Sequence, residues 1–460
     1  MPNFKKLAKK YEENCLSALV ELVRKKSIYD ESSISVDAPY GKGVKSGLDC
    51  LEKMAAAMGF NTRNVDGHCV EISYGENNGP LIGIYAHCDV VPASGKWDNP
   101  PFEGKIIGEG KEKKVIGRGT SDDKGPLVAA LYSLKLLKDN GLISNYRVRL
   151  VAGGDEERGS SCLDYYFKTK NNPHCDYGFT PDADFPLIYA EKGIVHGSLT
   201  KLINLSPIVA IDGGVASNAV CDKMVVTIPT DKKFLKKFLD EKINGDISEV
   251  GEIMIVTFKG KSAHGSTPEL GESAMAKGFA FLGSYYNNKF LLNLAKAIID
   301  TRGSLFKGNA TSKELGESTY NYGLVTYNSK NVLTISLDYR YGEDANADAD
   351  EAVNNLSKFV DMTFVPSSKS NILLFDKKSP LVATLMKSYK HMTHKFFDKP
   401  MAIGGGTYAK EAKNIVAYGS AFKGHPGNIH SPNEYIYVKD LFAQIAIYAD
   451  AIYKLGQLKK

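Results

Sequence analysis

The sequence has 460 residues, of which 43% are hydrophobic and 24% are charged, a composition that excludes collagen-like, disordered and coiled-coil proteins. The 58 Lys and Arg residues against 53 Asp and Glu residues give a net charge of +5, too weak to favour nucleic acid or a membrane surface as a partner. No apolar run approaches the roughly 20 residues that span a bilayer. The seven cysteines form no C-x-x-C pair and the N-terminal residues lack a secretory segment, so we expect a reducing, cytoplasmic location.

The first 190 residues alternate between helical and strand patterns. Apolar residues at helical spacing predict helices, and short apolar or alternating runs predict strands. The predicted helices cover residues 4–26, 43–58 and 119–140, and the predicted strands cover residues 80–86, 146–152 and 176–180. The run at 80–86 is apolar almost throughout, as in a strand that is buried on both faces. Strands that alternate with helices indicate an α/β unit with a mostly parallel central sheet.

From about residue 191 the pattern becomes that of an α+β segment. Strands are predicted at 254–258, 323–327, 332–341 and 371–375, and helices at 272–286 and 346–359. The α/β pattern returns after about residue 381 and ends in a helix predicted at 439–455. We therefore predict one catalytic domain, made of residues 1–190 and 381–460, that is interrupted by an inserted lid domain at 191–380.

Acidic and imidazole side chains follow the predicted strands. They are His87, Asp89, Asp122, Glu156, Glu157, Asp182 and, much later, His430. Each of them alone has an ordinary structural explanation, such as a turn, a helix start or a surface charge. Ligands of open α/β sheets bind beyond the carboxyl ends of the strands, so these groups should meet at one edge. They would repel one another and take up protons unless cations neutralised them, and zinc and manganese both accept imidazole and carboxylate ligands.

Five ordered motifs carry a family resemblance. They are AHCDVVP at 86–92, GRGTSDDKGP at 117–126, GDEERG at 154–159, TPDADFP at 180–186 and IHSP at 429–432. Together they resemble the M20 metallopeptidase family and, within it, the PepV-type dipeptidases (the Xaa-His or β-alanyl dipeptidase group). The resemblance implies a zinc-peptidase-like catalytic domain with a mostly parallel sheet, interrupted by a ferredoxin-like α+β lid.

The resemblance also implies a centre for two divalent metal ions, zinc or possibly manganese. His87 and Asp182 would bind one ion, Glu157 and His430 would bind the other, and Asp122 would bridge the two. In the family, the peptide bond after the bridging aspartate is often cis.

Two carboxylates next to these ligands have other implied roles. Glu156 would be the general base that takes a proton from a water molecule held between the metals. Asp89 would orient His87 and raise its basicity. The resemblance thus implies a dinuclear metal-dependent dipeptidase that hydrolyses the peptide bond of small dipeptides. Near His430, Glu434 is expected to hold that histidine in place, and Cys88 is expected to be a buried packing residue.

Lid residues are implied to bind the substrate. His264, in GKSAHGSTP at 260–268, would polarise the scissile carbonyl and stabilise the oxyanion, and Arg340 would bind the C-terminal carboxylate. Asn218 would contact the substrate or the oxyanion. Gly405 and Thr407 belong to a glycine loop, GGGTY at 404–408, whose backbone would approach the carboxylate. The insert resembles the enlarged lid of members whose active site is complete within one chain, so we expect a monomer-competent site.

Two other functions remain open from the sequence. An N-acyl-amino-acid amidohydrolase or deacylase would use the same metal-activated water on a different amide. A non-catalytic binding protein would be expected to lack a ligand or the base, and none is missing. A serine hydrolase is disfavoured because no G-x-S-x-G motif occurs. If the substrate is a dipeptide, its free amine is expected near Asp89 or Asp184.

Overall fold

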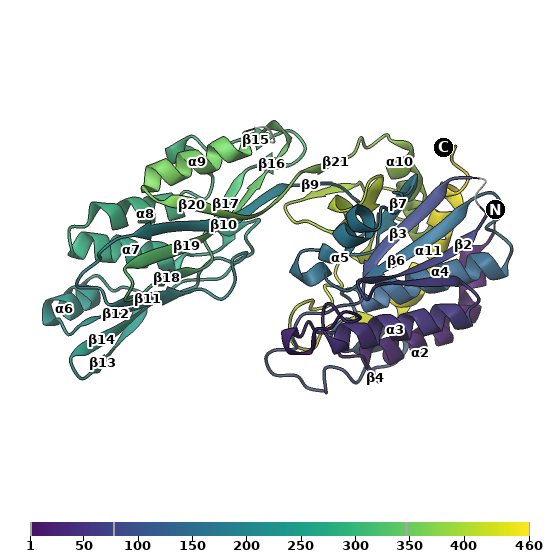
Figure 1. Cartoon of the computed structure of the whole chain (residues 1–460), viewed down its shortest axis with the longest axis horizontal. Helices are drawn as coiled ribbons and strands as arrows, with labels where there is room; N and C mark the ends of the chain where they lie inside the picture. Colours follow the sequence, from purple (N-terminus) through teal and green to yellow (C-terminus); the bar gives the residue numbers. More distant parts are fainter. Residues whose placement is uncertain (1, 77–78, 346–347, 460) are drawn as a thin grey trace. The chain divides into compact units, whose positions relative to one another are not determined.

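The computed structural model describes residues 2–76, 79–345 and 348–459, which form two compact units. The first unit comprises Met1–Tyr189, Phe375–Met401 and Thr407–Lys460, and the second comprises Ala190–Leu374 and Ala402–Gly406 (Figure 1). Residues 402–406 therefore pack with the second unit, although the sequence pattern assigned all of 381–460 to the catalytic domain. Residues 375–380, assigned to the lid from the sequence, pack with the first unit.

A mixed sheet, most of whose strands belong to the first unit, has the strand order β1-β2-β6-β3-β7-β23-β9-β21, with β22 beside β9. The strands are β1 (Asn61–Val65), β2 (Cys69–Gly75), β3 (Leu81–His87), β6 (Arg147–Gly153), β7 (Tyr177–Thr180), β9 (Ile188–Glu191), β21 (Leu373–Leu374), β22 (Met401–Ile403) and β23 (Ile415–Ala417). Strands β6, β3, β7 and β23 run parallel, whereas β1, β2, β9 and β21 pair antiparallel. The prediction of a mostly parallel sheet thus describes the centre, whereas the strands at both margins pair antiparallel.

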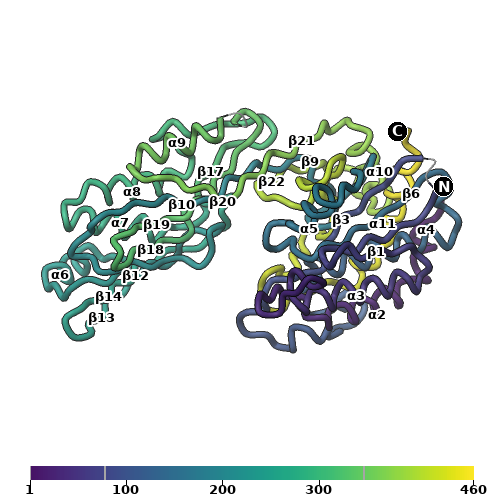
Figure 2. Tube along the Cα trace, viewed as in Figure 1, coloured from purple at the N-terminus to yellow at the C-terminus, as the bar shows by residue number. Residues whose placement is uncertain are grey.

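Every residue of β3 is buried, as its apolar sequence predicts, because helices pack on the sheet. The helices of this unit are α1 (Phe4–Ala8), α2 (Glu12–Val23), α3 (Lys42–Ala57), α4 (Lys124–Asp139), α5 (Ser161–Asp164), α10 (Pro380–Thr393) and α11 (Val438–Leu455). Helix α4 contacts β3 and β6, and α3 contacts β1 and β2. The first helix, α1, packs against the last, α11, so segments from opposite ends of the chain close this unit (Figure 2).

The continuous helix predicted at 4–26 is divided in the structure. A 3-10 turn at Lys9–Tyr11 separates α1 from α2. The ring of Tyr11 is buried there and its hydroxyl donates to Asp139 at 3.0 Å, which holds the chain at this turn.

Several short strands of the first unit lie outside the main sheet and pair with one another. Strand β8 (Ala183–Asp184) pairs with β24 (Ser420–Ala421), and β25 (Tyr435–Tyr437) pairs with β5 (Lys114–Ile116), which in turn pairs with β4 (Lys105–Ile107). These pairings fix the chain next to the motif residues around 118–123, 182 and 430.

An antiparallel sheet forms the centre of the second unit, in the strand order β13-β14-β12-β11-β18-β19-β10-β20, with β17 beside β19. The strands are β10 (Gly193–Leu202), β11 (Ala210–Gly213), β12 (Lys223–Pro229), β13 (Gly245–Val250), β14 (Ile253–Lys259), β17 (Thr319–Asn321), β18 (Val325–Tyr327), β19 (Val332–Tyr341) and β20 (Thr363–Ser370), and a separate small pair is formed by β15 (Thr311–Ser312) and β16 (Gly316–Glu317). The hairpin predicted at 323–341 is present as β18 and β19. The strand predicted at 371–375 is present as β21, but it pairs with β9 in the other sheet.

Helices α6 (Lys232–Asp240), α7 (Ala274–Tyr285), α8 (Lys289–Ile299) and α9 (Ala349–Val360) complete the second unit and share one apolar core with its sheet. Alternate residues of β12 and β14 are buried, as expected for strands with one face on such a core. The predicted start of α9 at residue 346 lies outside the described residues. The ferredoxin-like arrangement of the lid remains a prediction.

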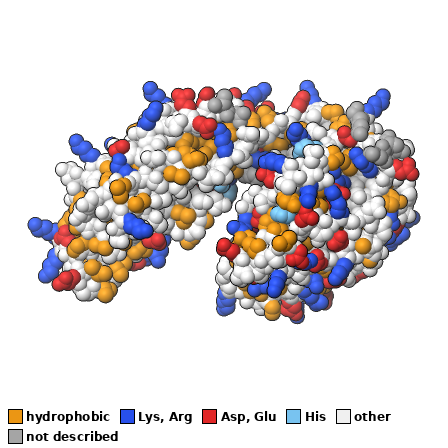
Figure 3. Space-filling model, in the orientation of Figure 1, with side chains coloured by type: hydrophobic (Ala, Val, Ile, Leu, Met, Phe, Trp, Pro, Cys, Tyr) orange, Lys and Arg blue, Asp and Glu red, His pale blue; other side chains and the backbone are white. Residues whose placement is uncertain are grey.

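The surface in Figure 3 shows basic and acidic side chains interspersed on the visible face, in agreement with the weak net charge of +5. Within the described part of the chain, none of the helices combines the length and the apolar character needed to cross a membrane.

Candidate active site

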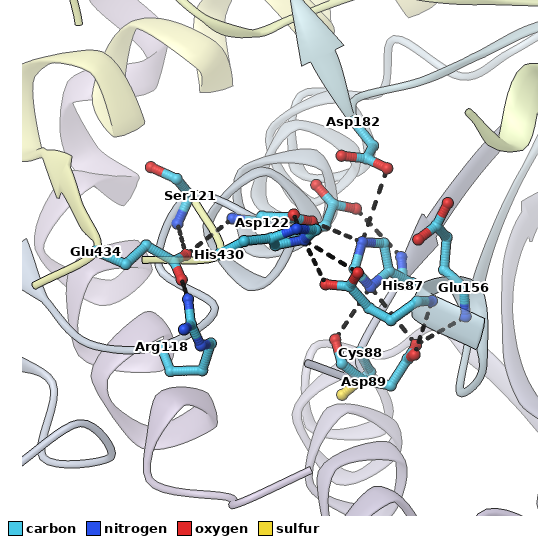
Figure 4. A network of polar contacts seen from close by, with 12 residues as sticks. His87, Cys88, Asp89, Arg118, Ser121, Asp122, Glu156, Asp182, His430 and Glu434 are labelled. Carbon is cyan, nitrogen blue, oxygen red and sulfur yellow. Dashed lines mark hydrogen bonds and ion pairs between the residues drawn. The ribbon is translucent and has the colours of Figure 1, made fainter. Parts of the chain in front are cut away.

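The parallel strands of the first unit end at one edge of the sheet, and the predicted metal ligands gather there. In the pairing of β3 with β6, His87 lies opposite Gly153, the last residue of β6. Glu156, Glu157 and Asp182 follow β6 and β7 directly. The sequence-predicted set His87, Asp122, Glu157, Asp182 and His430 therefore meets in one cluster, which Figure 4 shows with its polar contacts.

His87, Asp122 and Asp182 form the first group of ligand-type side chains. Their ligand atoms all lie within 4.8 Å of one another. Nε2 of His87 is 2.9 Å from Oδ1 of Asp122 and 3.7 Å from Oδ2 of Asp182. Nδ1 of His87 lies 3.0 Å from the backbone oxygen of Asp89. Because a carbonyl only accepts, Nδ1 carries the proton and Nε2 is the nitrogen that faces the two carboxylates.

Asp122, Glu157 and His430 form the second group, also within 4.8 Å. Nε2 of His430 is 2.9 Å from Oδ2 of Asp122 and 3.1 Å from Oε2 of Glu157. Asp122 thus belongs to both groups, with one carboxylate oxygen toward each imidazole. This is the arrangement that a bridging ligand requires.

Burial and mutual repulsion oppose the ionisation of these carboxyl groups. Burial raises the pKa of Asp182 to about 7, with a further contribution from the charge of Asp122, and burial raises the pKa values of Glu156 and Glu157. Hydrogen bonds to Asp122 and Glu157 raise the pKa of His430 to about 10. For Asp122, burial favours the neutral acid, but hydrogen bonds from His430 and His87 outweigh it and lower the pKa.

The cluster is therefore short of positive charge, and divalent cations would supply it. Imidazole nitrogen and carboxylate oxygen are ligands that zinc and similar divalent metals accept. Ligand atoms that lie within 4.8 Å of one another can share one ion at ordinary bond lengths of about 2.0–2.2 Å after small side-chain shifts. The donor set and its geometry thus fit one divalent ion in each group of three.

Asp89 does more in the structure than the sequence suggested. Its carboxylate oxygens accept hydrogen bonds from the backbone N–H groups of Glu156 and Glu157, both at 3.1 Å, and Oδ1 lies 3.5 Å from Nδ1 of His87. Asp89 therefore fixes the turn that carries both glutamates as well as the imidazole. Asp89 is buried and these contacts occupy both of its carboxylate oxygens, whereas Asp184 is exposed.

Glu156 and Glu157 occupy a short 3-10 helix, Glu156–Arg158, that ends at Gly159. Gly159 has φ +118°, a conformation that favours glycine, which explains the sharp turn after the strand. Figure 4 shows Glu156 on the same side of the cluster as Asp182 and His87.

Glu434 does not have the role predicted for it. Its Oε1 accepts hydrogen bonds from the backbone N–H groups of Ser121 at 2.9 Å and Asp122 at 3.2 Å, and its Oε2 pairs with Arg118 at 2.6 Å (Figure 4). Arg118 and Glu434 are both buried. The carboxylate of Glu434 therefore holds the backbone of Asp122, and Arg118 pairs with that carboxylate. Nothing in the sequence indicated that Arg118 and Glu434 pair. The Asp122–Asp123 peptide bond is cis.

Four of the predicted substrate-binding residues belong to the second unit: Asn218, His264, Arg340 and Gly405. The guanidinium of Arg340 pairs with Asp338, with Nη2 at 2.8 Å from Oδ2, and its Nη1 donates to the oxygen of Gly404 at 2.6 Å. The backbone N–H of Gly265 donates to the oxygen of Asn218 at 2.7 Å, so the segments that carry Asn218 and His264 lie side by side.

The ring of His264 is held in one orientation. Its Nδ1 accepts the backbone N–H of Ser266 at 3.3 Å and lies 2.7 Å from the Ser266 hydroxyl. Burial lowers the pKa of His264, and the charge of Arg340 lowers it further. A neutral imidazole that accepts at Nδ1 carries its proton on Nε2, which makes Nε2 a hydrogen-bond donor.

Thr407, the fifth predicted substrate-binding residue, belongs to the first unit. Its side chain accepts from the backbone N–H of Ala409 at 3.1 Å and caps the short 3-10 helix Tyr408–Lys410. This contact gives Thr407 a local structural role.

Comparison with known proteins agrees with the geometry. The model of peptidase family M20/M25/M40 matches residues 83–454. The chain belongs to this family. It is 33% identical to "Putative dipeptidase YtjP" of Bacillus subtilis (strain 168), over 97% of this chain and 98% of the relative, and 31% identical to a "Putative dipeptidase" of Staphylococcus aureus (strain USA300), over 98% and 99%.

The M20 fold is also found among solved structures. Human carnosine dipeptidase 1 superposes with a TM-score of 0.61 at 12% identity, covering 100% of both chains. As a member of the M20 family this protein is a peptidase and hence a hydrolase, and metallopeptidases of the family use divalent metals.

Proposed function

We propose that this M20 peptidase is a dinuclear metal-dependent dipeptidase. The observation that carries the proposal is the pair of ligand groups that share Asp122, with Glu156 beside them. The relatives in Bacillus subtilis and Staphylococcus aureus, which are matched over nearly their whole length, are named as dipeptidases.

The metal ligands would be divided between two sites. His87 and Asp182 would hold one divalent ion, Glu157 and His430 the other, and Asp122 both. Two such ions, zinc or manganese, would acidify a water molecule and polarise the scissile carbonyl. Glu434 and Arg118 would keep Asp122 in place through its backbone.

Glu156 would act as the general base and later as the general acid. Burial raises its pKa, which suits a group that must take a proton from water and then deliver it to the leaving amine. Asp89 would keep Glu156 in position through the backbone hydrogen bond at 3.1 Å.

The second unit would supply substrate-binding groups. Arg340 would bind the C-terminal carboxylate, His264 would donate from Nε2 to the oxyanion, and Asn218 and Gly405 would contact the substrate backbone or its carboxylate. Asp184 would bind the free amine. Because the insert resembles the enlarged lid of members whose site is complete within one chain, we propose that each chain is competent as a monomer.

The experiment is a hydrolysis panel with the full chain loaded with zinc or manganese. Dipeptides, tripeptides and N-acetyl amino acids with the same C-terminal residue are compared by kcat/KM. We expect dipeptides to be the best substrates. A preference for N-acetyl amino acids would replace the proposal with an amidohydrolase, and a preference for tripeptides would rule out the dipeptidase.

A further inference from the structure

Asp338 is a buried carboxylate in the middle of the predicted substrate-binding residues of the second unit. It lies on β19 and has no exposed surface. Nε of Arg340 donates to its Oδ1 at 3.0 Å, and Nη2 of Arg340 donates to its Oδ2 at 2.8 Å. With Nη1 bound to the oxygen of Gly404, the guanidinium of Arg340 is held on both of its sides. The plane of Arg340 is thus set by Asp338.

Both neighbouring strands place polar residues directly opposite Asp338. His196 on β10 is its pairing partner, and Nε2 of His196 lies 3.6 Å from Oδ1. Asn321 on β17 is its partner on the other side. The side-chain amide of Asn321 donates to the backbone oxygens of Ser217 at 2.8 Å and Ala219 at 3.2 Å. The segment that carries Asn218 is therefore tied to the same row of residues.

Asp338 also packs against the backbone that follows His264. A Cβ atom placed on Gly265 would lie 2.6 Å from Oδ2 of Asp338, closer than real Cβ contacts, so only glycine fits there without a shift. Ala219 and His264 form an isolated β-bridge, which links this loop to the segment around Asn218. One carboxylate thus contacts Arg340 directly and the His264 loop through Gly265.

We propose that Asp338 is a positioning residue. It sets the orientation of the Arg340 guanidinium, and through its contact with Gly265 it also fixes the position of the loop that carries His264. This inference rests on the functions proposed above for Arg340 and His264. Burial favours the neutral form of Asp338, but His196 and Arg340 more than offset it and lower its pKa, so the carboxylate is ionised when it holds Arg340. Asp338 itself does not bind the substrate, because Arg340 lies on its carboxylate.

The role predicts a specific kinetic defect. Removing the charge of Asp338 leaves Arg340 cationic but free to turn, so the enzyme should lose its preference for a free C-terminal carboxylate. A misplacement of about 1 Å can cost about 100-fold in rate. A merely structural role would instead lower the active fraction and reduce the turnover of all substrates equally.

The test compares a dipeptide with its C-terminal amide, using the metal-loaded full chain. Asp338→Asn should reduce kcat/KM for the dipeptide by about 10- to 100-fold and reduce that for the amide much less, at unchanged metal content. Arg340→Ala should erase the same preference. If Arg340→Ala erases it and Asp338→Asn, still folded, leaves it intact, the positioning role is overturned. If Arg340→Ala keeps the preference, the proposed function of Arg340 fails and this inference fails with it.

A second variant keeps the test informative if Asp338→Asn does not fold. Gly265→Ala removes no polar group but places a methyl 2.6 Å from Oδ2 of Asp338 and 2.9 Å from the backbone oxygen of Asn218. It should lower kcat on both substrates and weaken the preference for the dipeptide. Wild-type kinetics of Gly265→Ala would overturn the proposal. The matched control is Glu317→Gln, which removes a partly exposed ion pair with Arg302 at 3.2 Å and should leave both substrates unaffected.

Discussion

The two units carry polar clusters of opposite electrostatic character. In the first unit, the carboxyl groups of Asp89, Asp122, Glu156, Glu157 and Asp182 surround the imidazoles of His87 and His430, and burial opposes the ionisation of several of them. In the second unit, the buried cation Arg340 already has its counter-ion in Asp338. In the proposed function the first cluster would take up external cations to balance its carboxylates, whereas Arg340 in the second cluster is already paired with Asp338.

The difference predicts where metal should matter. Ions bound by the first cluster would stabilise the folded chain by RT ln(1 + [L]/Kd), which is about 4 kcal/mol at 1,000 times Kd. The second cluster gains nothing from them directly. Variants of the second unit should therefore change kinetics while the metal content stays constant.

Metal removal should have the largest effect. Dialysis against a chelator should reduce dipeptide hydrolysis to background and lower Tm, because the carboxylates then lose their neutralising charge. Addition of zinc or manganese should restore both, as measured by amino-acid release and thermal melting. Full activity of the chelated, metal-free protein would show that the first cluster does not require metal ions for catalysis.

Variants of the neighbouring residues Glu156 and Glu157 should distinguish a loss of catalysis from a loss of metal binding. Glu156→Ala should lower kcat by about 10²- to 10⁴-fold with metal content and Tm unchanged, because only the proton carrier is lost. Glu157→Ala, the matched control, should lose metal as well as activity. Retained turnover in Glu156→Ala would remove it as the base.

His264→Ala in the second unit should lower kcat by about 10²- to 10³-fold, the usual cost of an oxyanion donor. The variant lacks the Nε2–H donor. In the wild type, Nδ1 accepts from Ser266, which leaves the imidazole proton on Nε2. Stopped assays at saturating dipeptide, with metal analysis in parallel, measure it. An unchanged kcat, or a loss of metal, would contradict the contrast between the two clusters.

Glu434→Gln should have a smaller effect, on the order of 10- to 100-fold in metal affinity or activity. The amide keeps the shape but gives a weaker acceptor to the backbone of Ser121 and Asp122 and no ion pair to Arg118. Titration of the metal-free protein with zinc would measure the change. Wild-type affinity would mean that the Arg118–Glu434 pair does not support the bridging aspartate.

The sequence predicted the first cluster better than the second because strand ends can be read from local patterns. His87 and Asp182 closely follow the strands predicted at 80–86 and 176–180, so their meeting at one edge follows from the α/β rule. Arg118 and Glu434 are 316 positions apart, and no local pattern reports a buried pair over that distance. No sequence pattern singled out Asp338, since its contact with Gly265 depends on how a loop folds back onto the sheet.

The errors in the fold have the same origin. Strand β1, with the sequence NTRNV, lies at the sheet margin and is mostly polar, so it lacks the apolar signal that identified β3. The strand predicted at 371–375 was correct in position but pairs with β9, which local sequence cannot specify. The periodicity of apolar residues locates individual helices and strands, but long-range strand pairing determines which sheet a strand joins.

The most direct test of the metal centre is the number of divalent ions bound per chain. Elemental analysis of the protein after saturation with zinc and removal of free metal should give two ions for the wild type and for Glu156→Ala, and fewer for Asp182→Ala and His430→Ala. One ion or none in the wild type, or two ions in Asp182→Ala, would contradict a dinuclear centre bridged by Asp122.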